Sequence, residues 1–520
     1  MPTLHRIVIV VLGFACLAVQ SFSQSPFLKA FSLSQDPGQT QSPPPSNSIS
    51  HIFIGNATLW IGTGKGLARS NNGGRSWESF RTVPQFVNTG IFAINVKGDT
   101  VWASTGFTQN LSDQDIQTGS GYTYSTDNGT TWTHLPQTLD GLGDSLVTFG
   151  VNTVYFLPVV VPEQNVTYDI AVTPSAIWIA SWASGLRKST DQGHTWQRIV
   201  LPAMSFNSIA PTDTLIAYRI NPVPSPAGDN FKAFSVFAES DSVIWAGTAG
   251  GINKSTDAGM SWTKFNTLNQ RSHILSNWVI AIKEQHFGST SRIWCTNWLA
   301  DQTFDPNQQY GVSYSDDGGR IWKNFLQGIK AYDFAFKDSV AYVASDEGLY
   351  RTSDGGLSWN RSGTIIDPAN GQVIGSGAFF AVGVIGDTVY GGSSDGLART
   401  IDNGDHPFGQ TWEVIRAYQP VGSSGSTYAY PNPFSPGQEP CRVHYSTAGV
   451  PASVTIEVFD FSMHRVRTII KDAQRSGLQE HDEIWDGRDD SRNSVTNGVY
   501  FYRVVLNNGD PIWGKIMVLQ

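Results

Sequence analysis

Short apolar segments alternate with polar, glycine-containing turns through most of the chain. Each apolar segment carries a Trp or Tyr, and a Gly turn leads from it into a second short segment that ends in Ser or Thr. The pattern recurs in ATLWIGTGKGLARS (57–70), SAIWIASWASGLRKS (175–189), SVIWAGTAGGINKS (242–255), SVAYVASDEGLYRT (339–352) and DTVYGGSSDGLART (387–400). Segments this short, bounded by turn residues, are typical of β-strands. The pattern therefore predicts an all-β chain built from antiparallel strand pairs.

The turn after each strand pair has a fixed order of residue types: Ser or Thr, any, Asp or Asn, any, Gly, two further residues, then Trp. In STDQGHTW, the Asp191 carboxylate can accept backbone N–H groups, and Gly193 can adopt a left-handed conformation. Trp196 then brings a large ring into the next strand. The third position of the seven copies is held by Asn72, Asp127, Asp191, Asp257, Asp317, Asp354 and Asp402. In the seventh copy, the insertion DHPFGQ separates Gly404 from Trp412.

These seven stretches resemble Asp boxes, also called BNR repeats, the turn motif of sialidase-like and sortilin-like β-propellers. With the strands before and after each box, the repeat contains four strands at a spacing of roughly 40–65 residues, which is the size of a propeller blade. We therefore expect a seven-bladed β-propeller over residues 49–418. The resemblance places each box between the third and outermost strands, in a structural role. The motif indicates a fold and not an activity, because families that share it include enzymes, receptors and assembly factors.

The composition changes after the last repeat. Residues 419–429 read as a linker, and alternating strands follow from residue 430 to residue 520, as in an immunoglobulin-like β-sandwich. The ordered set Asn432-Pro-Phe434, Trp485-Asp-Gly487 and Gly498-Val-Tyr-Phe-Tyr502 resembles C-terminal sorting domains of the type IX secretion system. It also resembles the immunoglobulin-like domain of flagellar hook-capping proteins. The resemblance implies that the secretion machinery recognises residues 430–520.

Charge and the N-terminus restrict the partners. The 520 residues carry a net charge of −9 without a basic cluster, which argues against nucleic acid and anionic membranes as partners. Residues 1–23 resemble a secretory signal peptide, residues 24–48 read as a Pro/Ser-rich tether, and no transmembrane segment is expected. Cys295 and Cys441 fall in different predicted domains, so we expect no disulfide. These features predict a protein secreted by a bacterium or displayed on its outer surface.

Motifs for metal or cofactor chemistry are missing from the sequence, so we expect no metal or cofactor. Gly392-Ser-Ser-Asp-Gly396 matches the nucleophile-elbow pattern, but the same place in other repeats is a plain turn between strands. Tyr218-Arg-Ile-Asn-Pro222 partly matches an element of sialidases, although it follows the third box instead of preceding the first. A sialidase also needs three Arg side chains, a Tyr–Glu pair and an acidic partner. This set cannot be assembled from the sequence.

Function is expected in loops that depart from the repeat. The loops 107–121 and 299–311 are enlarged, and 137–167 and 202–230 are long inserts. Trp182 and Trp298 each lie four residues after the aromatic residue that the repeat itself carries. Each ring could stack on a sugar ring or could simply pack in the protein. The candidate ligand-binding residues are Trp182, Trp298, Phe107, Asp113, Asp115, Asp301 and Asp305. The acidic residues of this set, together with Asp140, Asp144 and Glu163, could include the carboxyl pair of a glycosidase. The alternative is that they are ordinary solvated loop residues.

We therefore expect a non-catalytic module that binds an extracellular protein or glycan. The alternative is a glycoside hydrolase or sialidase-like enzyme. A third possibility is an assembly factor like those of photosystem II, which share short Asp-box propellers. The predicted sorting domain argues against that role because it directs the chain out of the cell.

Overall fold

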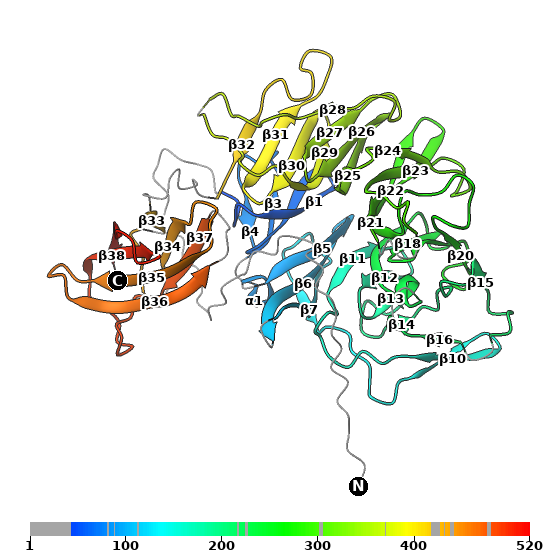
Figure 1. The fold of residues 1–520 in the computed structure, drawn as a ribbon, viewed down its shortest axis with the longest axis horizontal. Helices are drawn as coiled ribbons and strands as arrows, with labels where there is room; N and C mark the ends of the chain where they lie inside the picture. The colour runs from blue at the N-terminus through cyan, green and yellow to red at the C-terminus, as the bar shows by residue number, and fades with distance from the viewer. Residues whose placement is uncertain are drawn as a thin grey trace, which may run out of the picture.

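The computed structural model describes most of the chain from residue 43 onwards. The described ranges are 43–80, 83–87, 89–111, 114–215, 218–223, 227–300, 305–369, 371–417, 427–430, 432–436, 441–475 and 480–519. The predicted signal peptide and most of the predicted tether lie outside them, so those two interpretations stay predictions. Almost every element in these ranges is a β-strand (Figure 1).

Seven antiparallel sheets are arranged in a ring (Figure 1). The first four blades consist of β1 (Ile49–Gly55), β2 (Thr58–Thr63), β3 (Gly66–Ser70) and β4 (Glu78–Ser79); β5 (Gly90–Lys97), β6 (Thr100–Leu111), β7 (Gln114–Ser125) and β8 (Thr133–Leu135); β11 (Thr167–Val172), β12 (Ile177–Ser181), β13 (Gly185–Ser189) and β14 (Gln197–Arg198); and β17 (Ala233–Ala238), β18 (Ile244–Thr248), β19 (Gly251–Ser255) and β20 (Trp262–Phe265). The last three consist of β21 (Trp278–Phe287), β22 (Thr290–Trp298), β23 (Gly311–Ser315) and β24 (Lys323–Phe325); β25 (Ala331–Lys337), β26 (Val340–Ser345), β27 (Gly348–Thr352) and β28 (Asn360–Arg361); and β29 (Phe379–Ile385), β30 (Thr388–Ser393), β31 (Gly396–Ile401) and β32 (Glu413–Ile415). The predicted seven-bladed propeller is confirmed.

The first strand of each blade packs against the first strand of the next, and the ring closes where β1 packs against β29. The four strands of each blade are consecutive in sequence, so no strand is exchanged at the closure. The Ala417 amide donates a hydrogen bond to the Asn47 side chain at 2.8 Å, which joins the two ends of the propeller. The sequence did not show which segment closes the ring, and the structure supplies it.

Six of the seven predicted turns between third and fourth strands have one hydrogen-bond pattern. The Ser189 hydroxyl donates to Asp191 at 2.8 Å and accepts the Gly193 amide at 2.8 Å, while the Thr195 amide donates to Asp191 at 2.9 Å. In the turns of blades 1, 2, 4, 5 and 6, the glycine amide likewise donates to the Ser or Thr hydroxyl, at 2.7–2.9 Å. These turns, called repeat turns below, therefore satisfy their own backbone donors locally.

The seventh copy is an exception, so its assignment as an equivalent turn is wrong. Asp402 is buried and accepts hydrogen bonds from the Tyr342 hydroxyl and from Arg351 Nε of the neighbouring blade. The Thr400 hydroxyl donates to the Thr411 carbonyl oxygen instead of to this carboxylate. The six inserted residues widen the turn, and the freed carboxylate joins blades 6 and 7.

The glycine of each repeat turn packs against an aromatic ring of the preceding blade. An added Cβ would lie 2.5 Å from the Trp178 ring at Gly259 and 3.1 Å from the Trp102 ring at Gly193. At the ring closure, Gly74 faces Tyr390 of the last blade. The Trp or Tyr in each second strand is therefore a packing residue of the blade interface.

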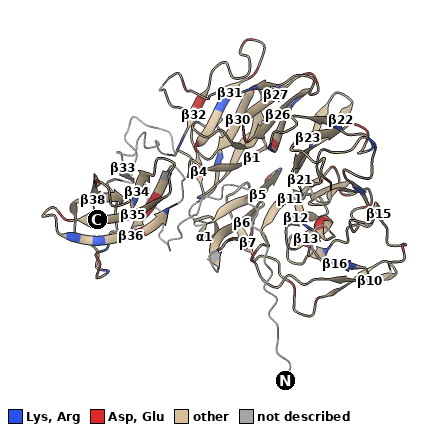
Figure 2. Cartoon of the chain, viewed as in Figure 1, with Lys and Arg blue, Asp and Glu red and all other residues tan. Residues whose placement is uncertain are grey.

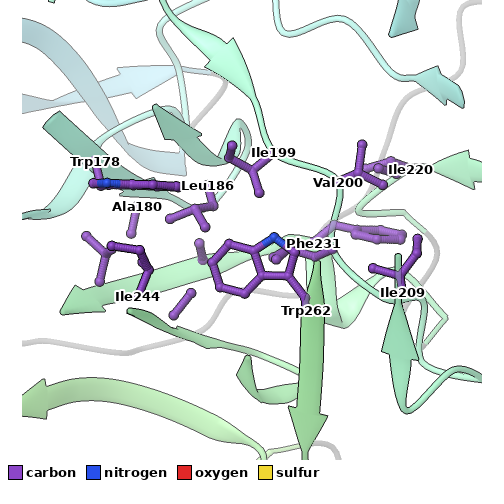
Figure 3. Close-up of a cluster of buried hydrophobic side chains, with 14 of the residues drawn as sticks. Trp178, Ala180, Leu186, Ile199, Val200, Ile209, Ile220, Phe231, Ile244 and Trp262 are labelled. Atoms are coloured by element: carbon purple, nitrogen blue, oxygen red, sulfur yellow. The ribbon is translucent and has the colours of Figure 1, made fainter. Parts of the chain in front are cut away.

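The two long inserts meet in one small sheet, in which β9 (Leu146–Phe149), β10 (Asn152–Phe156) and β16 (Arg219–Ile220) lie side by side. β15 (Ser208–Ile209) adds a fifth strand to blade 4, and η1 (Asp229–Phe231) precedes β17. The buried residues Ile209, Ile220 and Phe231 pack with Trp178 and Trp262 of blades 3 and 4 (Figure 3). The inserts are thus part of the propeller's core.

A second unit of two sheets follows the propeller. One sheet contains β33 (Thr427–Tyr430), β34 (Cys441–Ser446) and β37 (Glu480–Trp485), and the other contains β36 (Arg465–Arg475), β35 (Ala452–Phe459), β38 (Gly498–Leu506) and β39 (Ile512–Val518). They enclose a core around Trp485 and Tyr502. The immunoglobulin-like assignment, the sorting role and the linker 419–429 stay predictions.

The second unit lies beside blade 1 of the propeller (Figure 1). Lys65, in the turn between β2 and β3, forms a 3.2 Å ion pair with Asp482 of β37. Elsewhere, charged segments of both signs are scattered along a mostly uncharged ribbon (Figure 2). Cys295 and Cys441 are both buried. Among the described residues, no helix is long and apolar enough to cross a membrane.

Candidate functional site

The central channel contains a cavity of about 570 Å³. The first strands of all seven blades line its wall, and Gly64 and Ser394, from turns between second and third strands, line one end. That end, called the mouth below, is where the inner strands begin.

The pairing between the first and second strands of each blade is interrupted one or two residues after the first strand begins. At this point the first strand contains one residue more than the second strand. A β-bulge of this kind re-aims the inserted side chain. The inserted residues line the cavity in every blade, and five of them are aromatic: Phe92, Tyr168, Phe234, Tyr332 and Phe380. Blade 1 has Ser50 at this place, and blade 5 has Ile280 and Ala281.

We call these five residues the aromatic collar. All five are half-buried, so part of each ring faces the channel. Ring centroids lie 6.4 Å apart for Phe92 and Tyr168, 6.3 Å apart for Tyr168 and Phe234, and 5.4 Å apart for Tyr332 and Phe380. Two arcs of aromatic surface therefore run around the mouth, with gaps at blades 1 and 5.

Trp182 and Trp298 support the collar from behind. The Trp182 ring lies 5.4 Å from Phe234, and the Trp298 ring lies 5.3 Å from Tyr332, and both Trp belong to one hydrophobic cluster. Trp298 is only 3% exposed, and its indole N–H donates to the Ala331 carbonyl oxygen at 2.6 Å. Trp298 lines the central cavity behind Tyr332, but so little of its ring is exposed that ordinary packing is favoured over a stacking platform. Trp182 is half-buried.

A layer of ionisable groups lies next to the collar. Asp169 and Asp333 directly follow the bulges of blades 3 and 6, and His51 follows that of blade 1. Lys283 Nζ lies 2.7 Å from Asp333 Oδ1. All four groups line the same cavity. The charges of Lys283 and Asp333 affect the pKa values of both His51 and Asp169.

Burial in the channel wall perturbs two of these groups. It lowers the pKa of His51 to about 4 and raises the pKa of Asp169 to about 7. At Asp169 the effect of burial outweighs that of the backbone amide hydrogen bonds, which lower the pKa. Asp169 accepts the Val236 amide of the next blade at 3.0 Å, and Asp333 accepts the Val382 amide at 3.2 Å. Both carboxylates therefore join neighbouring inner strands.

Those predicted loop residues that the structure describes do not gather at the channel. The stretch 107–121 forms two long paired strands instead of a loop, with Phe107 half-buried along the hairpin and Asp115 exposed near its tip. Asp305 is buried and accepts the Asn307 amide at 3.0 Å, which fixes its own turn. Asp113 and Asp301 lie outside the described residues. None of the three described residues lines the central cavity.

The remaining loop acids have separate local roles. Asp140 is buried in ion pairs with Arg187 and Arg198, Asp144 accepts the Gly141 amide, and Glu163 accepts Gln109 Nε2. Within the ranges that the structure describes, no group of three or more His, Cys, Asp or Glu side chains is arranged to hold a metal ion.

The two enzyme-like sequence matches lie in a blade turn and in the insert sheet. The Ser393 hydroxyl donates to the Gly396 carbonyl oxygen at 2.9 Å, as Thr63 does to Gly66 in blade 1. Arg219 lies in β16 of the insert sheet, where its guanidinium stacks on Tyr155. Arg219 does not line the central channel. The serine at the nucleophile position of the first match is Ser394, which lies at the mouth in the turn between β30 and β31, as Gly64 does in the turn between β2 and β3.

Sequence reasoning missed the collar, although the signal was present. Near the start of five inner strands, a four-residue segment has an aromatic residue at its second position and an apolar residue at its fourth. The segments are IFAI, TYDI, AFSV, AYDF and FFAV. Blade 1 has ISHI in the same place. These segments read as ordinary buried strands until the bulge shows that the aromatic residue turns towards the channel.

Comparison with known proteins shows the class of fold. No protein-family model matches the chain. A xyloglucanase of Acetivibrio thermocellus, Xgh74A, is 23% identical over 215 residues, which are 41% of this chain and 19% of that protein. The chain thus matches about a fifth of the length of this curated relative.

Among solved structures, the GH74 enzyme of Niastella koreensis aligns with a TM-score of 0.51 and 13% identity, over 93% of this chain and 74% of that one. An ancestral GH74 enzyme aligns with a TM-score of 0.47 and 13% identity, over 92% and 63% of the two chains. At such low identity the likeness shows the fold alone. The chain is a β-propeller protein.

Proposed function

We propose that the chain is a non-catalytic binding protein that holds part of an extracellular glycan against the aromatic collar. One observation carries the proposal: five of seven equivalent bulge positions present half-buried aromatic rings around one cavity. Aromatic faces bind the apolar side of sugar rings, and clefts of several hundred Å³ are typical of small-ligand sites. The extracellular setting rests on the predicted signal peptide.

The chemistry of the mouth suits a neutral, ring-containing ligand. The collar offers flat apolar surface, while Ser50 and Gln117 line the same cavity with hydrogen-bonding groups. Lys283 offsets the charge of Asp333, and burial raises the pKa of Asp169 to about 7. With Glu284, the cavity wall therefore carries only a small negative charge, which does not suit a strongly ionic ligand. The similarity to a xyloglucanase over 215 residues also favours a β-glucan ligand over a protein ligand.

A glycoside hydrolase is the second candidate, and one observation favours it. Asp169, with its pKa raised to about 7, shares a cavity with the Lys283-paired Asp333, and hydrolases use one protonated and one ionised carboxyl group. Against this role, both carboxylates accept backbone amides of adjacent blades. A group fixed in this way is poorly placed to exchange a proton with a ligand.

A combined screen of the full chain separates the two candidates. Binding to an array of plant and bacterial glycans is measured first, and each bound glycan is then incubated with the protein and analysed for new reducing ends. We expect binding without cleavage. Cleavage that disappears in Asp169→Asn would replace the binding proposal with the hydrolase, and binding to no glycan would overturn the proposed ligand class.

A further inference from the structure

A second, much smaller cavity lies outside the channel, where the first insert crosses blade 3. Its volume is about 20 Å³, which is room for one small ion or one water molecule. Apolar side chains form part of its wall, including Leu186, Ile199, Ile220 and Phe231 (Figure 3). The polar part of the wall comes from Asp140 of the insert and from Arg187 and Arg198 of the blade.

The charges around this cavity do not balance. Arg187 and Arg198 lie 2.9 and 3.0 Å from the same oxygen, Asp140 Oδ1. The side chains of the two Arg are only 3% and 8% exposed, and that of Asp140 is 5% exposed. The second oxygen, Oδ2, accepts the Val159 amide at 2.7 Å. Two buried cations therefore share one buried anion.

Each guanidinium also has a donor without an acceptor among the described residues. These are Arg187 Nε and Arg198 Nη1, and both are shielded from solvent. Burying a charged donor without a partner is costly, so such donors in folded proteins are paired with a counter-charge or an ordered molecule. Asp144 contributes its backbone carbonyl oxygen to Arg198, and its carboxylate accepts the Gly141 amide. The charge of this carboxylate also favours the charged form of Arg198, but the group is exposed to solvent.

We propose that this cavity binds one small monovalent anion, chloride, between Arg187 and Arg198. The net charge of the cluster selects an anion over neutral water. The volume admits a halide and excludes sulfate, phosphate and carboxylates. Because Asp140 belongs to the insert and both Arg belong to blade 3, the anion fastens the insert to the blade.

Thermal unfolding of the full chain tests the proposal at pH 7.5 and constant ionic strength, with sodium chloride exchanged stepwise for sodium gluconate. We expect the melting temperature to rise by about 2 °C or more with chloride and to saturate, as ligand binding to the folded state requires. Bromide should replace chloride, and crystals grown in bromide should show an anomalous peak beside Arg187 and Arg198. Equal melting curves in chloride and gluconate, or no anomalous peak, would show that water alone occupies the cavity.

Two substitutions with opposite expected effects make the test specific. Arg198→Met removes the excess charge and should abolish the chloride-dependent shift. Asp140→Asn increases the excess charge and should lower the chloride concentration at half-saturation. Lys188→Met is the matched control: it removes a cation from the same strand as Arg187, but Lys188 donates to the Ala258 carbonyl oxygen and does not line the cavity.

The control should retain the wild-type chloride dependence. A chloride shift that survives in Arg198→Met, or a weaker apparent affinity in Asp140→Asn, would overturn the site. If Arg198→Met does not fold, the bromide peak and Asp140→Asn decide the question.

Discussion

The contact between the glycine of a repeat turn and the ring behind it can be tested with Gly259→Ala. Gly259 has a φ of +90°, in the left-handed region. An added Cβ would lie 2.5 Å from Trp178 Cη2 and 3.2 Å from Cζ3. Trp178 is fully buried and contacts Trp262 at a centroid distance of 6.4 Å, so its ring has little room to move.

The expected cost has two parts. A left-handed alanine costs about 1–2 kcal/mol, and overpacking in a closely packed site costs about 1–3 kcal/mol. We therefore expect Gly259→Ala to lower the free energy of unfolding by about 2–5 kcal/mol. Urea unfolding followed by tryptophan fluorescence measures this change.

The matched control is Gly288→Ala. Gly288 has a φ of +58°, but an added Cβ there meets nothing within 4 Å. It should show only the conformational part, about 1–2 kcal/mol. If Gly259→Ala costs no more than Gly288→Ala, the glycine–ring contact does not stabilise the blade interface.

Three further predictions concern charge, export and domain contact. Hydrogen bonds, chiefly from Thr131, Thr195 and Ser358, hold the pKa values of Asp127, Asp191 and Asp354 at about 2, so the stability that they contribute is complete above pH 4 and is lost as the pH falls towards 2. Urea midpoints measured between pH 5 and pH 2 should fall less steeply in Asp191→Asn than in the wild type; parallel profiles would contradict the role of the carboxylate. Deletion of residues 430–520 should leave the chain in the periplasm of its host, as fractionation would show, and normal surface delivery would refute the sorting interpretation. Asp482→Asn removes the ion pair with Lys65 and should widen the distribution of distances between the two units in small-angle X-ray scattering; an unchanged profile would show that other contacts hold them.

The sequence predicted the propeller because its repeat turns carry their own hydrogen-bond partners. Ser189, Asp191 and Gly193 form a closed local network, so their spacing alone specifies the turn. The seventh copy shows the limit of this reasoning. Asp402 has the right sequence neighbours, but an insertion and a buried Tyr342 from another blade redirect its carboxylate.

The candidate site was harder to predict, because it depends on contacts between blades. Trp298 stood out as an extra aromatic residue, yet its ring is almost fully buried and supports Tyr332 from behind. Phe234 and Tyr332 looked like ordinary strand residues, since only the bulges turn them towards the channel. The inserts were expected to carry function as loops, but Ile209 and Ile220 place them in the core.

The most direct test of the collar is calorimetric titration of the full chain with a xyloglucan oligosaccharide, in the wild type and in a Phe234→Ala/Tyr332→Ala variant. Phe206→Ala is the control, because Phe206 is 41% exposed and stacks on Tyr218 outside the channel. Aromatic anchors at binding sites commonly account for 2 kcal/mol or more, so we expect the double variant to bind at least about 30-fold more weakly. The control should bind like the wild type, with melting temperatures recorded for all three proteins. Wild-type affinity in a folded double variant would contradict the collar as the ligand site.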